Sequence, residues 1–311
     1  MIEKILFKGV EALKIENDEV SVIVIPAWGG KIASFYNKSK EFELLFQHNG
    51  DYKQPKLFSD FSEFDASGFD DAFPNIKEEI IDVNGKGIRF PDHGEIWSLS
   101  FHYKTEGEVI KLWAEGTVLP YLYEKEISIN GNQLEIKYNI ENIGDFSFPC
   151  IWTMHCLINC QNNMELKLPT ETSMVEVAED STFLGNIGTI HTFPQTKDVH
   201  GNIYQLDRIF DESVNKYEKY YIKDELSNGK CGVYYPNADI GFAIEYDAKK
   251  LPYLGFWVTE GGFRNDYNCA LEPSNGYYDK ISIAKKNNAI FELGSGNSLK
   301  FDLLLSFKNL E

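Results

Sequence analysis

The sequence predicts an all-β protein, an antiparallel sandwich of large sheets. Short runs of β-branched and aromatic residues alternate with polar residues along most of the 311 residues. Turn dipeptides separate these runs, and Asn84-Gly85 is the clearest because it suits the type I′ turn of a two-residue hairpin. Helix signals are confined to residues 214–221 and 277–286. Many short strands joined by hairpins are typical of a sandwich.

The strands are expected in the following order. Three hairpins are predicted where a turn signal separates two strand runs: 19–26 with 31–36, 80–83 with 88–90, and 124–129 with 133–141. Further strands are predicted at 97–104, 109–118, 148–156, 164–168, 219–223, 232–235, 241–246, 254–259, 268–272 and 298–307. The segment 47–71 has no strand pattern. Irregular loops of that length in a compact domain are often functional.

Composition and charge limit the domain organisation and the partners. The chain is 43% hydrophobic, which is enough for a large core, and its net charge is −18. We expect a single domain over residues 1–311, because no linker, low-complexity run or internal repeat divides the chain. The strong negative charge argues against nucleic acid or an anionic membrane as a partner. We expect a small-molecule substrate and a monomer or homodimer.

The N-terminus and the cysteines bear on the compartment. Glu3 and Glu11 interrupt the short apolar runs at the N-terminus, so we expect no signal peptide. No apolar run approaches the roughly 20 residues that span a bilayer. The five cysteines are an odd number at irregular spacing, as in a protein with reduced thiols. The expected location is therefore the cytoplasm.

The segment 254–278, LGFWVTEGGFRNDYNCALEPSNGYY, is the richest in candidate chemistry. It predicts a buried strand, a Gly-Gly loop and a second strand that stops at Glu272, just before Pro273. The strand fixes the direction of this carboxylate, and partial burial raises its pKa toward working pH, as a general base requires. Trp257 and several other aromatic residues crowd the same region. Aromatic faces beside carboxylates are typical of sugar-binding sites.

Two of the six histidines stand in unusual settings. His93 lies in a Pro-Asp-His-Gly turn, which places it at a strand mouth; the plainer alternative is a histidine that caps a turn. His155 lies in the apolar run from Pro149 to Asn159 and is expected inside the sandwich. A lone histidine on an apolar strand is more often a packed core residue than a catalyst, so both interpretations stay open on this pattern alone.

A metal site is not expected. Cys156 and Cys160 are separated by three residues, with Cys150 and His155 nearby, but a structural zinc site would need a second such pair. On a strand, His155 and Cys156 would also point to opposite faces. Walker, dinucleotide-binding, HExxH and GxSxG motifs are absent from the sequence, so we expect no cofactor either.

Four short elements occur in one order along the chain. They are GFDDAFPN at 68–75, DHG at 92–94, WTMHCLIN at 152–159, and LGFWVTEGGF with ALEPSNG within 254–276. In an all-strand chain this order resembles the aldose 1-epimerase (galactose mutarotase-like) family, and it runs through most of the chain. The resemblance implies an antiparallel β-supersandwich with few short helices and an open carbohydrate cleft on one sheet.

The resemblance also implies residue roles. On the family pattern Glu272 is the base that removes the proton from the anomeric hydroxyl, and His155 is the acid that protonates the ring oxygen. Ring opening, rotation about C1–C2 and closure then give the other anomer, while His93 hydrogen-bonds and polarises the sugar. A carboxylate and an imidazolium meet this need without a metal. We expect the substrate to contact Asp71, Asn75, Lys77, Trp152, Lys219, Trp257 and Arg264.

Departures from the family pattern keep alternatives open. No arginine follows Asn75, Glu95 follows the His-Gly pair, and Lys219 lies in the strand that supplies a substrate-binding aspartate in the family. A phosphate clamp needs fixed cations, so a hexose-6-phosphate 1-epimerase is the weaker alternative, although Lys77, Arg89 and Arg264 could supply one.

Two further alternatives keep the same candidate residues. One is a non-catalytic sugar-binding or regulatory protein of the same fold. The other is a glycosidase, which needs two carboxylates about 5–5.5 Å or about 6.5–9.5 Å apart, such as Glu272 with Glu260 or Asp71. The distance between the side chains decides the second case.

Overall fold

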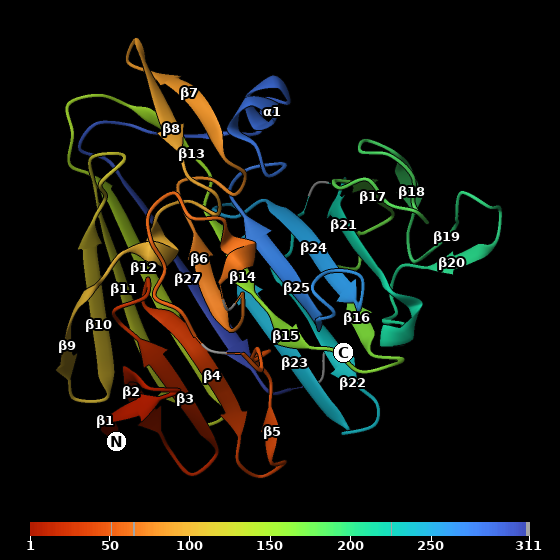
Figure 1. Cartoon of the computed structure of the whole chain (residues 1–311), viewed down its shortest axis with the longest axis horizontal. Helices are drawn as coiled ribbons and strands as arrows, with labels where there is room; N and C mark the ends of the chain where they lie inside the picture. Colours follow the sequence, from red (N-terminus) through yellow and green to blue (C-terminus); the bar gives the residue numbers. More distant parts are fainter. Residues whose placement is uncertain (51, 65, 225, 309–311) are drawn as a thin grey trace.

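Two large antiparallel sheets pack against each other, which confirms the predicted all-β sandwich (Figure 1). The structure is a computed structural model that describes residues 1–50, 52–64, 66–224 and 226–308. The last three residues of the predicted domain 1–311 lie outside this range. Within it, no helix is long and apolar enough to cross a membrane.

The larger sheet has 13 strands among the described residues and carries the candidate site. Its strands lie in the order β1 (Ile2–Phe7), β2 (Val10–Glu16), β3 (Val20–Ile25), β4 (Lys31–Asn37), β6 (Phe69–Ala72), β14 (Thr153–Cys156), β25 (Tyr267–Ser274), β24 (Tyr253–Glu260), β21 (Lys216–Ile222), β17 (Met174–Val177) and β18 (Ile190–Thr192). Two short strands pair at its side: β5 (Phe42–Glu43) with β4, and β15 (Ile158–Asn159) with β25.

The smaller sheet has eight strands. They lie in the order β16 (Glu165–Lys167), β22 (Lys230–Tyr235), β23 (Ile240–Tyr246), β27 (Ser298–Ser306), β12 (Gln133–Asn142), β11 (Tyr121–Asn130), β10 (Val109–Glu115) and β9 (His102–Glu106). Three ribbons complete the strands: β7 (Glu79–Val83) with β8 (Lys86–Phe90), β13 (Phe148–Cys150) with β26 (Phe291–Leu293), and β19 (Gln195–Lys197) with β20 (Ile203–Gln205). The helical turns are η1 (Phe61–Glu63), η2 (Ile96–Ser98), η3 (Glu212–Val214) and α1 (Ile281–Lys286).

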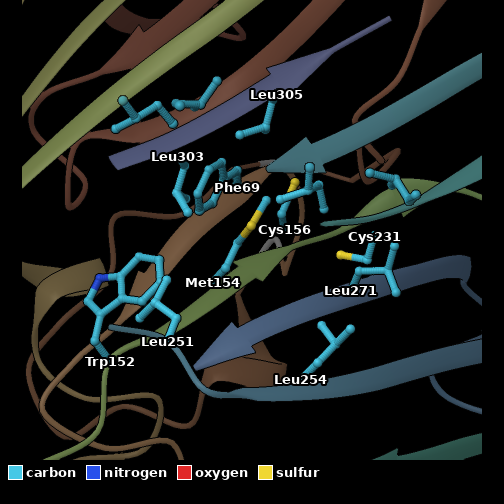
Figure 2. Packing of buried hydrophobic residues seen from close by; sticks show 14 of the residues in the cluster. Phe69, Trp152, Met154, Cys156, Cys231, Leu251, Leu254, Leu271, Leu303 and Leu305 are labelled. Atoms are coloured by element: carbon cyan, nitrogen blue, oxygen red, sulfur yellow. The ribbon is translucent and has the colours of Figure 1, made fainter. Parts of the chain in front are cut away.

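The core lies between the two sheets. Figure 2 shows Phe69, Met154 and Leu271 of the larger sheet beside Leu303 and Leu305 of β27, and each is at most 1% exposed. Successive side chains of a strand point to opposite faces. The residues next to these core positions therefore face away from the smaller sheet, and Glu272 and His155 are among them.

The three predicted hairpins are confirmed as β3–β4, β7–β8 and β11–β12. In β7–β8 the last pair is Val83 with Lys86, which leaves Asn84 and Gly85 as the two-residue loop. Both have positive φ, 52° and 75°. A type I′ turn needs this conformation at both positions, so the dipeptide predicted the turn for the correct reason.

Several element predictions are wrong in detail. The predicted helix at 214–221 is wrong: only Val214 belongs to a helical turn, η3, and residues 216–221 lie in β21. All residues of β21 except Tyr217 are buried, as in a strand covered on both faces. The predicted strand 97–104 is divided between η2 and β9. The predicted strand 148–156 is also divided: β13 pairs with β26, and only β14 enters the larger sheet. The helix predicted at 277–286 is confirmed for its second half, α1.

Candidate active site

A cavity of about 560 Å³ opens on the face of the larger sheet that points away from the smaller sheet. Its floor comes from β14, β21, β24 and β25, and a segment around η1 forms part of its wall. This segment belongs to the irregular stretch 47–71. Six of the residues predicted from the sequence line the cavity: Lys77, His93, His155, Lys219, Trp257 and Glu272.

His155 and Glu272 come from neighbouring strands at matched positions. Thr153 of β14 pairs with Ser274 of β25, and Ile158 of β15 pairs with Cys269. Both pairs follow one antiparallel register, which places His155 opposite Glu272. Directly opposed residues share a face, with Cβ atoms about 4.5–5.5 Å apart. The sheet therefore presents the imidazole and the carboxylate side by side to the cavity.

His93 approaches the same place from the loop after β8. Its φ is 54°, and Gly94 after it has φ 70° and lies so close to Phe73 that a Cβ would be 2.1 Å from the Phe73 carbonyl oxygen. Only glycine fits there, which explains the Asp-His-Gly motif. His93 Nδ1 lies 3.0 Å from Asp92 Oδ1, and the His93 ring meets His155 edge-on at 4.9 Å between centroids.

Phe61 is a residue of the site that no sequence motif indicated. Its ring stacks on His93 at 4.3 Å and meets His155 edge-on at 4.9 Å. The Phe61 N–H donates to Asp92 Oδ2 at 2.8 Å, so one carboxylate holds both Phe61 and His93. The only signal in the sequence was the length of the irregular segment 47–71, which predicted function without naming a residue.

Glu272 shares a cation with a second carboxylate. Lys219 Nζ of β21 lies 3.1 Å from Glu272 Oε2 and 3.0 Å from Asp279 Oδ1. Asp279 also accepts a hydrogen bond from the Tyr221 hydroxyl at 2.8 Å. Lys219, Asp279 and Glu272 are at most 6% exposed, and Tyr221 is fully buried. We call these four residues the Lys219 cluster.

The cluster shifts the pKa values of its two carboxylates in opposite directions. Burial raises the pKa of Glu272 above its usual value, and Lys219 only partly offsets this effect. Burial acts in the same direction on Asp279, but Lys219 and the Tyr221 hydroxyl outweigh it and hold the pKa of Asp279 below its usual value. Burial alone would lower the pKa of Lys219, yet Asp279 and Glu272 raise it, so Lys219 stays charged. Groups with pKa values pushed apart are typical of catalytic sites.

His155 is held in its neutral form. Burial lowers the pKa of its ring well below the usual value, and the positive potential of His93, Lys219 and Lys31 lowers it further. Its Nδ1 atom is buried and has no hydrogen-bond partner among the described residues. A buried ring nitrogen without a partner costs free energy unless a ligand or water satisfies it. His155 is thus placed to meet a polar atom in the cavity.

Four predicted substrate contacts are corrected, because these residues do not line the cavity. The first is Asp71. It lies on the core face of β6 and binds Lys125 Nζ at 2.8 Å and the Tyr138 hydroxyl at 2.9 Å. Its neighbour Asp70 pairs with His155 in register and shares its face. The motif was found correctly, but a difference of one residue turns a side chain to the opposite face.

The other three corrections have separate causes. Trp152 is fully buried between the sheets, where its indole N–H donates to the Tyr123 hydroxyl at 2.8 Å. Asn75 is also fully buried and donates to the carbonyls of Lys77 and Pro91, which ties two loops together. Arg264 is not among the lining residues, and its guanidinium pairs at 3.4 Å with Asp266, which does line the cavity.

The glycosidase pairs considered from the sequence do not meet in the cavity. Glu260 lies five residues from Gly255 along β24, and Gly255 is the partner of Glu272 in β25. An odd separation puts Glu260 on the opposite face, where Lys216 Nζ binds it at 3.0 Å. Asp71 is also on the core side. Neither carboxylate shares a cleft with Glu272.

The cavity wall is strongly acidic. Among the described residues that line it, seven are carboxylates: Asp60, Glu78, Asp92, Glu179, Asp266, Glu272 and Asp279. Three lining residues are cations, and each is paired with a carboxylate: Lys77 with Glu179, Arg89 with Glu78 at 2.7 Å, and Lys219 within its cluster. An anionic group in the cavity would find its cations already neutralised.

Aromatic rings also line the cavity. Trp257 and Phe263 line the cavity and meet at 5.6 Å between centroids, nearly perpendicular to each other. Tyr217 stacks on Trp257 from outside at 5.6 Å. In register, Trp257 faces Lys219 across the strand pair. An apolar ring thus lies beside the ammonium, an arrangement that suits a ligand with both hydroxyl groups and C–H faces.

The described residues contain no group of three or more His, Cys, Asp or Glu side chains arranged to hold a metal ion. Cys156 and Cys160, considered above for zinc, are buried free thiols.

Comparison with known proteins identifies the fold. The model of a family described as domain of unknown function (DUF4432) matches residues 124–307. A galactose mutarotase-like protein from Lactobacillus casei ATCC 334 has a similar structure, with a TM-score of 0.71 at 14% identity over 96% of this chain and 100% of that one. A galactose mutarotase related enzyme from Lactobacillus acidophilus gives 0.69 at 14% identity over 96% and 97%.

A galactose mutarotase-like protein from Clostridium acetobutylicum gives a TM-score of 0.67 at 13% identity over 100% of this chain and 99% of that one. No curated protein matches the sequence significantly. These likenesses confirm the galactose mutarotase-like fold that the four motifs predicted. At such identities they describe the fold and leave the activity to be argued from the site.

Proposed function

The chain belongs to the family described as domain of unknown function (DUF4432), and we propose that it is an aldose 1-epimerase-like isomerase that interconverts the α and β anomers of a sugar. The observation that carries this proposal is the register of β14 and β25, which aims His155 and Glu272 into one cavity. Mutarotation needs one proton removed and one delivered at a single hemiacetal. A carboxylate beside an imidazole supplies both.

The proposed reaction balances without any other reactant. Glu272 takes the proton of the anomeric hydroxyl as the bond from C1 to the ring oxygen breaks, and His155 gives a proton to that oxygen. The product is the open-chain aldehyde; rotation about C1–C2 and the reverse transfers close the ring on the other face. His155 is neutral in the free site, whereas in the reacting form it carries one proton and Glu272 is ionised. Charge that develops on the ring oxygen favours this form by raising the pKa of the imidazole.

The other cavity residues receive supporting roles. His93, fixed by Asp92 and Phe61, is proposed to hydrogen-bond the sugar near the reacting oxygen. Lys219 and Lys77 offer N–H donors to hydroxyl groups, and Trp257 offers a ring face to the C–H side of the sugar. The acidic wall favours an unphosphorylated sugar over a hexose 6-phosphate, because the three lining cations are already paired.

Glu272 and Asp279 are a second possible pair of glycosidase carboxylates, which the sequence did not suggest. Their geometry argues against a glycosidase mechanism. A glycosidase places its two carboxylates on either side of the scissile bond. Here one ammonium lies between the two carboxylates, in contact with both, so the space that a glycosidic bond would need is filled by Lys219 Nζ. An isomerase needs only one of the two acids as a base.

Anomer exchange measured by NMR tests the proposal. A panel of unphosphorylated aldoses is mixed with the protein, and exchange between the two anomeric proton signals is followed against buffer alone. Exchange that is faster with the protein supports an isomerase. A sugar that binds, by chemical shift changes in the protein, without faster exchange supports the alternative, a non-catalytic binding protein of the same fold. We also propose a cytoplasmic location, which the five free, buried thiols support.

A further inference from the structure

Lys219 reaches Glu272 from two strands away. β24 lies between β21 and β25, so the two backbones are separated by about two strand spacings, roughly 10 Å. Lys219 pairs in register with Trp257, whereas Glu272 pairs with Gly255. The ammonium therefore extends along and across β24 before it meets the carboxylate at 3.1 Å.

Gly255 is the residue over which this contact passes. It faces Tyr221 on one side and Glu272 on the other. A Cβ at this position would lie 3.0 Å from Glu272 Oε2 and 3.3 Å from two atoms of the Tyr221 ring. Its φ is not in the left-handed region, so the backbone does not require glycine there. The absence of a side chain is what leaves room for Glu272 and Tyr221 to approach each other.

Asp279 and Tyr221 fix the far side of the ammonium. Asp279 Oδ1 forms an ion pair with Lys219 Nζ at 3.0 Å and accepts from the Tyr221 hydroxyl at 2.8 Å. The Asp279 backbone carbonyl accepts from the Lys77 N–H at 3.0 Å. Asp279 is thus held from one strand, β21, and from the loop that carries Lys77. Its position is set by groups other than Glu272, so Lys219 is anchored independently of the base.

We propose that Lys219 is a positioning residue of the isomerase site: anchored by Asp279 and Tyr221, its ammonium crosses the gap at Gly255 and holds the buried Glu272 carboxylate charged and aimed into the cavity. The isomerase part of this inference rests on the proposed function. The ion cluster itself is a property of the fold that can be measured without any sugar.

Glu272 needs a neighbouring cation because its carboxylate is buried. Glu272 is 1% exposed, and a buried carboxylate without a cation becomes protonated and useless as a base. The other charged or titratable groups that face it are His155 from β14, His93 from the loop after β8, and Asp279 beyond Lys219. His155 is neutral and Asp279 opposes ionisation of Glu272. Lys219 thus contributes most to keeping the base ionised, and His93 adds a smaller effect of the same sign.

The test is an NMR titration of protein labelled with ¹³C at the glutamate carboxyl groups, in which the Glu272 signal is identified by its loss in Glu272→Gln. In Lys219→Met we expect the titration midpoint of Glu272 to move to higher pH. In Lys219→Arg it should return toward the native value. In Asp279→Asn it should move to lower pH, because a negative charge is removed while the ammonium remains.

These opposite signs separate electrostatics from general damage to the fold. Lys125→Met is the matched control. Lys125 of β11 forms a buried ion pair with Asp71, which lies on the core face of the larger sheet, away from the cavity. We expect it to leave the Glu272 midpoint unchanged. An unchanged midpoint in Lys219→Met, or shifts of the same sign in Lys219→Met and Asp279→Asn, would overturn the proposal.

A kinetic arm joins the inference to the proposed function. At neutral pH, kcat/KM for anomer exchange should fall by roughly 10- to 1,000-fold in Lys219→Met, the range expected when an opposite charge within contact distance is lost, and its acid limb should move to higher pH. If the native protein exchanges no sugar, the isomerase proposal fails while the titration still decides the role of Lys219. A native exchange rate that is unchanged in Lys219→Met would sink the inference and leave the isomerase proposal standing.

Discussion

His155 and Glu272 lie opposite each other on the antiparallel neighbours β14 and β25, in one register recorded on both sides of them. Their side chains leave the larger sheet on the face away from the core and enter the same cavity. The two residues are 117 positions apart in the chain, so only the pairing of the strands brings them together.

Stability should depend on pH through His155. Its pKa is lowered on folding, so below the unfolded value of about 6.5 the unfolded chain binds a proton that the folded protein excludes, and stability falls as the pH falls. Between pH 7 and pH 5.5 the free energy of unfolding of the native protein should fall by about 1 kcal/mol more than that of His155→Gln. Urea unfolding of both proteins at the two pH values measures this. Equal losses would mean that His155 is not held neutral in the folded protein.

Gly255→Ala tests whether Glu272 needs the free space that the missing side chain of Gly255 leaves on β24. The added methyl group would lie 3.0 Å from Glu272 Oε2, so the carboxylate must shift. A displaced base is expected to lower kcat/KM by about ten- to a hundredfold with the melting temperature little changed. Gly87→Ala is the control, since its Cβ would meet only Ile80 at an ordinary 3.4 Å. Full activity of Gly255→Ala would show that Glu272 needs no free space at β24.

Phe61→Ala tests whether the segment around η1 belongs to the site. Loss of the ring removes contacts with both histidines, each worth about 0.5–1.5 kcal/mol, so kcat/KM should fall by about tenfold or more. Phe64→Ala is the matched control, because the Phe64 ring packs against Trp97 and does not line the cavity. Similar rates for the two variants would count against a functional role for Phe61.

Substrate charge provides a test that needs no mutation. The wall carries seven carboxylates against three paired cations, so a dianionic phosphate should be excluded. We expect kcat/KM for an unphosphorylated aldose to exceed that for its 6-phosphate by at least about tenfold, and the difference to shrink with added salt. A preference for the 6-phosphate would favour the hexose-6-phosphate alternative over the proposal.

Short sequence patterns predicted much of the fold and part of the candidate site. Asn84-Gly85 predicted its hairpin because the turn chemistry is contained in two residues. His155 and Glu272 were identified from motif order, which needs no knowledge of pairing. Asp71 was assigned to the site although Asp70 has the correct face, since the pleat of β6 is set by its partners in the sheet.

The parts that the sequence could not predict depend on long-range contacts. Phe61 reaches His93 because an irregular segment crosses the sheet, and no periodicity describes such a path. Trp152 lies between β13 and β14 in a run, 148–158, that is buried throughout, so its residue type did not distinguish the core from the cavity. Lys219 was expected to contact substrate, but its ion pair with Asp279 requires the order β21–β24–β25, which only the folded sheet defines.

Glu272 is the proposed base of the anomer exchange. Anomer exchange by NMR should be fast with the native protein and reduced by about 100- to 10,000-fold in Glu272→Gln, while the unfolding midpoint remains close to native. Glu260→Gln is the control, because Glu260 is a buried carboxylate of β24 on the opposite face. Native exchange in Glu272→Gln, with the variant folded, would contradict the account.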